Sequence, residues 1–209
     1  MPDIHSISYR EITYRDSRDL TDFIDRLQNP KNAPLYPQKR LLHHLYLMDS
    51  FCGCSYAKGA YVGQKLIGLI LGRCQGQRTV HLHAAAQKKL LVLRLLASRL
   101  GRSYYNAYRL FNRADRWLLQ TCPESFQGEL IFMAVDPRFR HQGVALSLLG
   151  SFHAYMLSMG VGQICLFTDS ACAVSFYDRQ RFERLSTLYW PEKSRPQAFA
   201  FYLYKFSYF

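Results

Sequence analysis

The residues with the clearest chemical meaning lie in one short segment, ELIFMAVDPRFRHQGVA, between Glu129 and Ala145. The sequence predicts an apolar strand over 128–135, then a loop, and then a helix that begins directly after Gly143. The first N–H groups of a helix lack intrahelical partners and carry about half a positive charge, so they suit a phosphate or pyrophosphate. Gly143 lets the backbone approach such a ligand closely, and the small residue Ala145 leaves that approach open.

Arg138 and Arg140 are expected to add positive charge at the rim of this loop. A glycine between a strand and a helix also fits an ordinary tight turn, but the longer pattern V-x-P-x-x-R-x-x-G-x-A is more specific. The chain has neither the G-x-G-x-x-G pattern of dinucleotide sites nor a Walker loop. The pattern resembles the coenzyme A-binding motif of the GNAT superfamily of N-acetyltransferases. Its five positions are Val135, Pro137, Arg140, Gly143 and Ala145.

A second stretch, LFTDSACAVSFYDRQRF, runs from Leu166 to Phe182 and is similar to the strand and helix that follow the motif in this family. Ser170 occupies a position where Asn is common, and Arg181 a position where Gly is common. The residues that match the recurring family positions are Ala173, Phe176, Tyr177 and Phe182.

The resemblance implies an α/β (α+β) fold with a mixed, mostly antiparallel central sheet of about six to seven strands flanked by helices. The fourth and fifth strands would splay apart, and the pantetheine arm of acetyl-CoA would pair with the backbone near Met133 and Val135. Residues implied to hold the rest of the cofactor are Arg140, His141, Gln142, Gly143, Val144, Ala145 and Ser170. The activity implied is acetyl transfer from acetyl-CoA to a primary amine by direct attack in a ternary complex, without a metal.

Glu129 and Tyr177 are the candidate catalytic residues. Glu129 lies six residues before Val135, so on a regular strand the two share a face. Its spacing resembles that of the general-base glutamate of some histone-type members, although an ordinary salt-bridged glutamate fits equally well. Tyr177 matches the tyrosine that protonates the departing thiolate, and the alternative is a core ring with its hydroxyl at the surface. For His141, within the loop, a phosphate contact or plain exposure is favoured over a base.

The remaining histidines and the cysteines give weaker signals. His81 and His83 alternate along an expected strand and could approach the acceptor, whereas His43 and His44 are expected at the surface. The chain has six cysteines and no export signal, so reduced thiols are expected. Cys52-Gly-Cys54 lies near two histidines, but this spacing matches no common zinc site.

Hydrophobic periodicity predicts alternating strands and helices within one domain over 1–209, with the coenzyme A-binding core over about 128–185. The other expected elements are a strand over 8–13, a helix from Ser17, a loop at Pro34 and Pro37, a hairpin over 60–72, a helix from Gly143, a strand over 163–168, a helix over 171–180 and two strands flanking the turn at 191–197.

Positive charge is concentrated in one region. The net charge is +12, and ten Lys and Arg lie between Arg73 and Arg116 against a single acid, Asp115. Residues 73–123 are expected to form a basic helical insert between the third and fourth strands, split near Gly101. The second helix has an apolar stripe of Tyr104, Tyr108, Phe111, Ala114 and Leu118, opposite Arg102, Arg109, Arg113 and Arg116.

This arginine stripe fits a solvated amphipathic helix, but it could also recruit an anionic partner such as RNA. The alternative function is therefore a non-catalytic regulatory or nucleic-acid-binding module with an acyl-CoA fold. If the stripe borders the acceptor cleft, it favours neutral or acidic amines, or a protein with an acidic surface, over polycations. Neither a membrane span nor a signal peptide is expected, which indicates a cytoplasmic location. The chain is expected to be a monomer or a homodimer.

Overall fold

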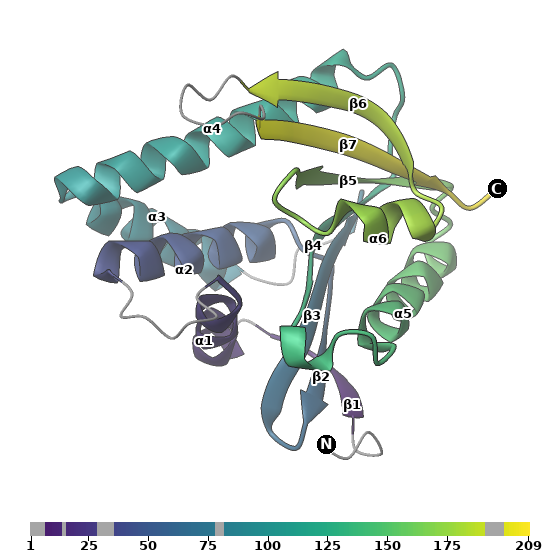
Figure 1. Cartoon of the computed structure of the whole chain (residues 1–209), viewed down its shortest axis with the longest axis horizontal. Coiled ribbons are helices and arrows are strands. Elements are labelled where there is room, and N and C mark those ends of the chain that lie inside the picture. Colours follow the sequence, from purple (N-terminus) through teal and green to yellow (C-terminus); the bar gives the residue numbers. More distant parts are fainter. Residues whose placement is uncertain (1–6, 14–15, 29–35, 78–81, 191–198) are drawn as a thin grey trace.

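Seven strands form one twisted sheet in the computed structural model, which describes residues 7–13, 16–28, 36–77, 82–190 and 199–209 (Figure 1). The strand order is β1-β2-β3-β4-β5-β7-β6. Every neighbouring pair is antiparallel except β4 and β5, which are parallel. This mixed sheet confirms the predicted fold class. The strands are β1 (Ile7–Glu11), β2 (Tyr56–Val62), β3 (Lys65–Cys74), β4 (Gly128–Val135), β5 (Gln163–Asp169), β6 (Glu183–Trp190) and β7 (Phe199–Ser207).

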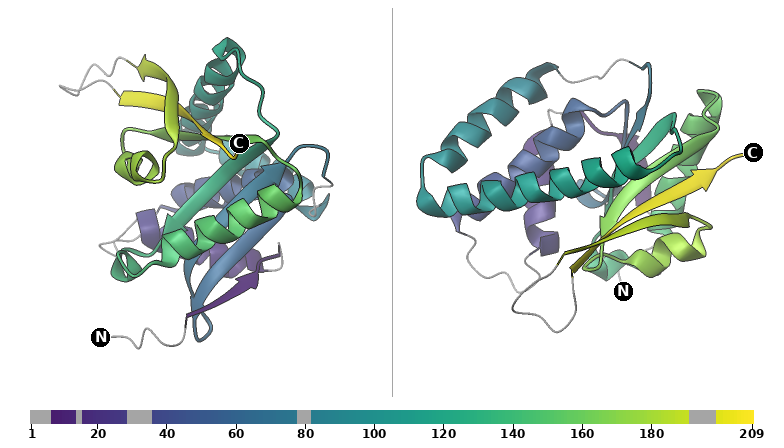
Figure 2. Two further views of the ribbon diagram at one scale, coloured as in Figure 1. Left: turned by 90° about the vertical axis from the view of Figure 1, so that its right-hand side faces the viewer. Right: turned by 90° about the horizontal axis from the view of Figure 1, so that it is seen from above.

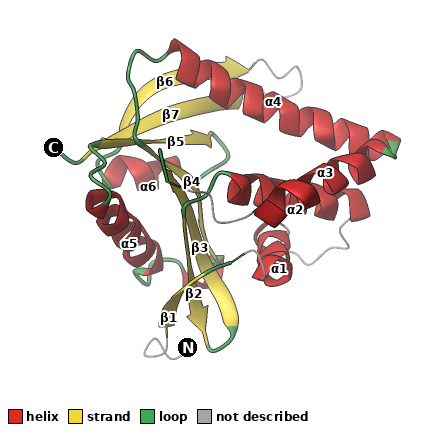
Figure 3. Cartoon of the chain, turned by 180° about the vertical axis from the view of Figure 1, so that it is seen from behind, coloured by secondary structure: helices red, strands yellow, loops and turns green. Residues whose placement is uncertain are grey.

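Helices cover both faces of the sheet (Figures 1 and 3). Four helices, α1 to α4, lie on one face, and α5 and α6 lie on the other, so we refer to the α4 face and the α5 face. Figure 2 shows α3 and α4 running side by side in opposite directions. The helices are α1 (Ser17–Gln28), α2 (Pro37–Cys52), α3 (Leu82–Leu96), α4 (Arg99–Thr121), α5 (Val144–Ser158) and α6 (Val174–Arg179).

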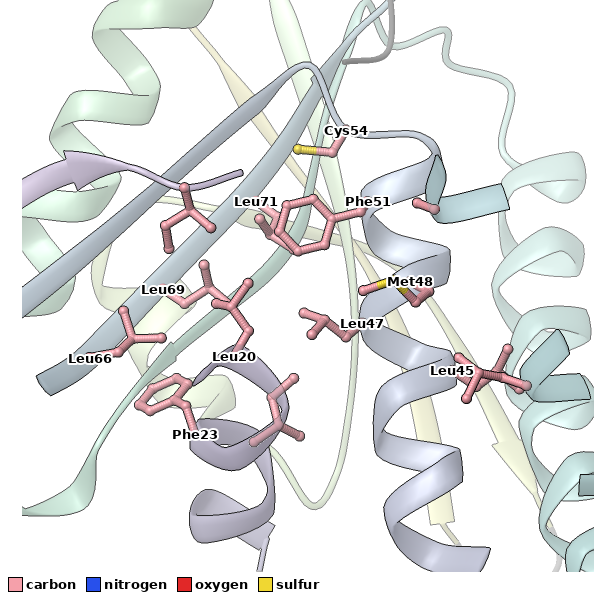
Figure 4. Close-up of a cluster of buried hydrophobic side chains, with 14 of the residues drawn as sticks. Leu20, Phe23, Leu45, Leu47, Met48, Phe51, Cys54, Leu66, Leu69 and Leu71 are labelled. Carbon is pink, nitrogen blue, oxygen red and sulfur yellow. The ribbon is translucent and has the colours of Figure 1, made fainter. Parts of the chain in front are cut away.

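Each face has its own apolar core. On the α4 face, α1 and α2 pack on β3 through side chains such as Phe23, Phe51 and Leu71, all fully buried (Figure 4). On the α5 face, Phe152 packs over Gly72, where a Cβ atom would lie only 2.1 Å from the ring. Burying one such aromatic ring contributes about 1.5–3 kcal/mol, so both helical layers are firmly attached to the sheet.

The N-terminal half contains a helix that the sequence analysis missed. Pro37, expected to mark a loop, is instead at the start of α2, where its fixed φ suits a first helical turn. His43 on this helix is not a surface residue, because its side chain is only 1% exposed and its Nδ1 pairs with Asp25 of α1. His44 is half-buried.

The helical insert between β3 and β4 is confirmed, with two differences in detail. The chain breaks between α3 and α4 at Ser98, three residues before Gly101, and the Ser98 hydroxyl accepts a hydrogen bond from Gly101 N–H at 3.0 Å. A Cβ at Gly101 would lie 2.1 Å from the Leu95 carbonyl oxygen, so the glycine lets the two helices meet closely. His83 has a helical backbone in α3, so the expected strand there is wrong; His81 lies outside the described residues.

No helix in the described part of the chain is both long and apolar enough to cross a bilayer. All six cysteines are free thiols. Within the same described ranges, no three or more His, Cys, Asp or Glu side chains gather as a metal site would require.

Candidate functional site

The central feature of the site is the point where β4 and β5 part. The two strands pair only from Gly128 to Leu130 on β4 and from Ile164 to Leu166 on β5. We call the unpaired remainder the β4–β5 split. It begins next to an irregularity in the β3–β4 ladder, where Gly72 opposes Leu130 but Leu71 opposes Phe132. The extra residue, Ile131, is a β-bulge, and bulges bend the strand that contains them. The expected splaying of the fourth and fifth strands is thereby confirmed.

The backbone of β4 turns a free edge toward this split. The N–H of Asp136 donates to the carbonyl of Ile67 on β3 at 2.8 Å, and Val135 lies opposite Gly68. In an antiparallel ladder, this pattern places the N–H and C=O of Val135 away from β3. Met133, two residues earlier, has the same orientation. Both residues thus point backbone donors and acceptors into the split, and their pairing with a cofactor stays a prediction.

The N-terminus of α5 follows β4 after one short turn. Gly143, at the helix start, has φ +79°, in the left-handed region that favours glycine, and a Cβ atom there would meet nothing within 4 Å. No side chain in the described structure caps the helix, so the N–H groups at its start have no side-chain partner there. Residues 140–145, which we call the α5 cradle, therefore have the geometry expected of an anion site.

The charges around the α5 cradle differ from expectation in one respect. Arg138 does not stand free at the rim, because its guanidinium contacts the buried carboxylate of Asp136 at 2.5 and 3.0 Å. The same contact lowers the pKa of Asp136. Arg140 is exposed and forms no ion pair within the described ranges, so it is the cation available to a ligand. His141 is also exposed, with a left-handed φ of +61°, while the Gln142 side-chain amide donates to the Arg138 carbonyl at 3.2 Å.

Tyr177 and Ser170 lie on the β5 side of the site. Tyr177, on α6, is half-buried among Phe176, Phe182 and Tyr204. Burial raises the pKa of its hydroxyl above the ordinary value, so the phenol stays protonated at neutral pH. The Ser170 hydroxyl accepts a hydrogen bond from the backbone N–H of Ala200 on β7 at 3.2 Å. Its contact with a cofactor stays a prediction.

Glu129 lies on a different face from the one expected. The bulge at Ile131 shifts the alternation of β4 by one residue, so Met133 and Val135 face α5 whereas Glu129 faces α4. The Glu129 carboxylate forms an ion pair with Arg73 across the β3–β4 ladder. The predicted shared face with Val135 is therefore wrong, and a catalytic role of Glu129 stays a prediction.

Three residues on the α4 face of the split were not expected from the sequence. Asp115 on α4, Asp169 on β5 and Tyr46 on α2 are close enough to influence one another electrostatically. Burial and then the carboxylates of Glu129 and Asp169 raise the pKa of Asp115 to about 7. One signal was available, because Asp115 is four residues after Phe111 and so falls within the apolar stripe rather than on the arginine side.

Comparison with known proteins identifies the fold. No protein-family model matches the sequence, and no curated protein is similar to it. Among solved structures, a protein from Desulfovibrio desulfuricans assigned to the GNAT family of acetyltransferases superposes with a TM-score of 0.56 at 12% identity, covering 97% of this chain and 99% of that one.

Two further neighbours are acetyltransferases with different acceptors. The polyamine N-acetyltransferase of Drosophila melanogaster, which forms N-acetylagmatine, has a TM-score of 0.56 at 11% identity over 97% of this chain and 100% of that one. The ribosomal-protein-S18-alanine N-acetyltransferase of Escherichia coli has a TM-score of 0.54 at 10% identity over 96% and 93%. The chain therefore has the GNAT fold.

Proposed function

We propose that this chain with the GNAT fold is an N-acetyltransferase that moves an acetyl group from acetyl-CoA to a primary amine. The observation that supports this most directly is the β4–β5 split, which exposes backbone groups of Met133 and Val135 and ends beside the α5 cradle. A free strand edge inside a sheet leaves polar backbone groups in need of partners. An extended ligand with amide groups can supply them.

The residues present fit the two chemically distinct parts of acetyl-CoA. The amide-bearing pantetheine arm suits the backbone of Met133 and Val135, which offers donors and acceptors as a neighbouring strand would. The pyrophosphate suits the free N–H groups of the α5 cradle together with Arg140. When bound, acetyl-CoA supplies an activated acyl group as a thioester.

The protein then contributes orientation, polarisation and proton transfer. Holding the amine against the thioester carbonyl contributes about 7–11 kcal/mol in favourable cases. The backbone N–H of Val135 faces the split, so it is placed to polarise the carbonyl oxygen. The hydroxyl of Tyr177, protonated at neutral pH, can donate to the departing sulfur. Because the neighbours named above acetylate different amines, the fold alone does not specify the acceptor.

Isothermal titration calorimetry with acetyl-CoA tests the proposal. Gly143→Asp places a carboxylate where the pyrophosphate is expected, so we expect at least a tenfold weaker affinity because of charge repulsion and blocked approach. Gly160→Asp is a matched control, since Gly160 also has a left-handed φ, +70°, and open space around its Cβ position. The control variant should bind acetyl-CoA like the unaltered protein.

Two results would contradict this proposal. One is an absence of binding heat between the unaltered protein and acetyl-CoA. The other is equal affinity of the Gly143→Asp and Gly160→Asp variants for acetyl-CoA, which would show that the pyrophosphate does not bind at the α5 cradle.

A second candidate function rests on the exposed side of α4. Arg102, Arg109, Arg113 and Arg116 are all exposed there, on the side of the helix opposite Leu118. Clustered arginines bind phosphate groups well, so a nucleic-acid-binding role of this helix is proposed as the alternative to catalysis.

A further inference from the structure

Asp115 is placed at the β4–β5 split by the inserted helix α4. Phe111, Asp115 and Leu118 follow one another at helical spacing, so they lie on one side of α4. Phe111 and Leu118 pack with Cys165 of β5 and Phe201 of β7. Asp115 therefore points toward the sheet rather than toward solvent, and it is half-buried.

Two carboxylates face Asp115 from the sheet, that of Glu129 on β4 and that of Asp169 on β5. Glu129 pairs with Cys165 in the short paired region, which sets it on the α4 face. Asp169 is four residues after Cys165 on β5, so it lies on that same face. Because pairing with β4 ends at Leu166, Asp169 belongs to the unpaired part of β5. The two strands thus contribute one carboxylate before the split and one within it.

Asp115 differs from these neighbours because, among the described residues, its carboxylate has neither an ion pair nor a hydrogen bond. Glu129 forms an ion pair with Arg73, and Asp169 accepts a hydrogen bond from the N–H of Ala171 at 2.8 Å. The Asp115 carboxylate makes no hydrogen bond or ion pair with any residue of the described structure. From α2, the facing titratable group is Tyr46, whose pKa is raised to about 12 by burial and the nearby acids, so it remains neutral.

The arginines of α4 do not compensate for this charge. Arg109, Arg113 and Arg116 are exposed on the other side of the helix. These side chains therefore do not form a basic wall along the split, so the condition under which a polycationic acceptor would be disfavoured is not met. A half-buried acid without a cation, beside a gap in the sheet, is suited to receive a cation from outside.

We propose that Asp115 is the residue that accepts a proton from the acceptor amine, and that this acceptor is a protonated primary amine drawn to Asp115 and Asp169. The inference rests on the proposed acetyl transfer and names the substrate class of that site. Because Asp115 lies on α4, the proposal gives the helical insert between β3 and β4 a role in acetyl transfer rather than in nucleic-acid binding.

The protons balance in the following way. The ammonium group of the acceptor gives one proton to the Asp115 carboxylate, which leaves a neutral nucleophile. Attack forms the C–N bond and breaks the C–S bond of the thioester. The nitrogen then loses its second proton to solvent, while the departing thiolate gains a proton from Tyr177. Solvent takes the proton from Asp115 and returns one to Tyr177, so one proton is released per turnover. A pKa of about 7 for Asp115 suits this task, because at neutral pH the carboxylate is substantially ionised yet basic enough to take a proton.

Asp115→Asn tests the proposal, with acetyl-CoA and 1,4-diaminobutane as substrates. We expect kcat to fall by about 100-fold or more. The ionisation near pH 7 in the profile of kcat/KM should disappear. Acetyl-CoA affinity should not change, because Asp115 is on the α4 face whereas the α5 cradle is at the opposite face. Calorimetry with 1,4-diaminobutane in the presence of coenzyme A, where no turnover occurs, should show at least tenfold weaker diamine binding.

Two controls make the result specific. Glu129→Gln removes the alternative base, and we expect a smaller loss of kcat. The ionisation in the pH profile should remain but move to lower pH, because the Glu129 carboxylate helps to raise the pKa of Asp115. The melting temperature monitors folding. The direction in which it changes with pH follows from the difference in the pKa of Asp115 between the folded and unfolded states. The pKa of Asp115 is raised above the unfolded value of 3.8, so native stability falls as pH rises from about 4 to 7. Asp115→Asn lacks this loss and should melt higher than the unaltered protein above pH 7.

The proposal is overturned if Asp115→Asn keeps its kcat and its pH profile, or if the unaltered protein binds no diamine in the presence of coenzyme A. It is also overturned if neutral or acidic amines are acetylated in preference to the diamine. Failure of acetyl-CoA itself to bind is a separate result, which contradicts the proposed function first.

Discussion

Tyr177 has a phenol that is held in an apolar setting by three aromatic neighbours. Burial disfavours its ionised form, so it is available as a proton donor throughout the neutral range. No hydrogen bond within the described ranges occupies this hydroxyl, in contrast to that of Tyr204, which donates to Asp178 at 2.9 Å. The hydroxyl is therefore free of protein partners and can donate to a ligand, which favours the role as acid.

Tyr177→Phe removes this proton donor and little else. We expect kcat for acetyl transfer to fall by about 100-fold, since general acid catalysis typically contributes that much or more, while acetyl-CoA affinity stays nearly unchanged. Tyr189→Phe is the matched control, because Tyr189 is 68% exposed on β6. Steady-state kinetics together with calorimetry separate the two effects, and unchanged turnover in Tyr177→Phe would remove the tyrosine from the mechanism.

At the scale of elements, one inserted residue decides the form of the site. Ile131 interrupts the β3–β4 ladder directly after Leu130, the last residue of β4 that pairs with β5. The bulge bends β4 away from its parallel neighbour and also reverses which side chains face α5. A single local irregularity therefore opens the split and moves Glu129 to the opposite side of the sheet from Val135.

A second element-scale feature is the attachment of α5 to β7. His153 of α5 lies 4.5 Å from the Phe206 ring, measured between centroids, and its Nδ1 is 2.7 Å from the Tyr208 hydroxyl. Burial disfavours the imidazolium and lowers the pKa of His153 to about 4. The unfolded chain takes up a proton near pH 6.5 and the native state does not, so stability is lost as pH falls from 6.5 toward 4.

The melting temperature of the unaltered protein should fall between pH 7 and pH 4.5, and we expect this fall, the acid limb, to be several degrees smaller in His153→Phe. One kcal/mol of stability corresponds to about 2–4 °C in a chain of this length. The phenyl ring keeps the packing against Phe206 but does not titrate. His141→Asn, at an exposed position, should leave the limb unchanged. An equally steep limb in His153→Phe would assign the acid sensitivity to other groups, His44 first, since burial and Arg40 lower its pKa.

At the scale of the whole molecule, charge is sorted between the two sides of α4. The exposed side includes Arg102, Arg109, Arg113 and Arg116, and the side facing the sheet has Asp115 opposite Glu129 and Asp169. Net charge alone, +12, therefore describes the outer surface and not the site. An anionic partner outside and a cationic acceptor inside are compatible, since they would use opposite sides of one helix.

Replacing Arg102, Arg109, Arg113 and Arg116 with Gln tests the outer side. In filter binding with a single-stranded RNA across salt concentrations, we expect the slope of log affinity against log salt to become shallower by up to about 3. Acetyl transfer should be retained, because none of these side chains lies at the split. An identical slope in the variant would show that these arginines do not bind nucleic acid and are simply exposed to solvent.

Much of this architecture could be read from local pattern. The bounds of β4, the helix after Gly143 and the exposed arginines of α4 follow from periodicity, which depends only on neighbours in the chain. The α5 cradle could be located because a glycine in a strand–loop–helix segment is a local signal. Helix α2 was missed because Pro37 fits both a loop and a first helical turn, and only the packing of Phe51 and its neighbours decides between them.

The sequence by itself determined most of the chain's elements, their order and the anion-binding end of α5, since each depends on residues that are adjacent or a few positions apart. Only the tertiary structure decided what faces the split. The bulge at Ile131 arises where β4 pairs with β3, and the approach of Asp115 to Glu129 and Asp169 joins three segments distant in sequence. Charge interactions of this kind depend on distance and burial, which no local pattern of residues specifies.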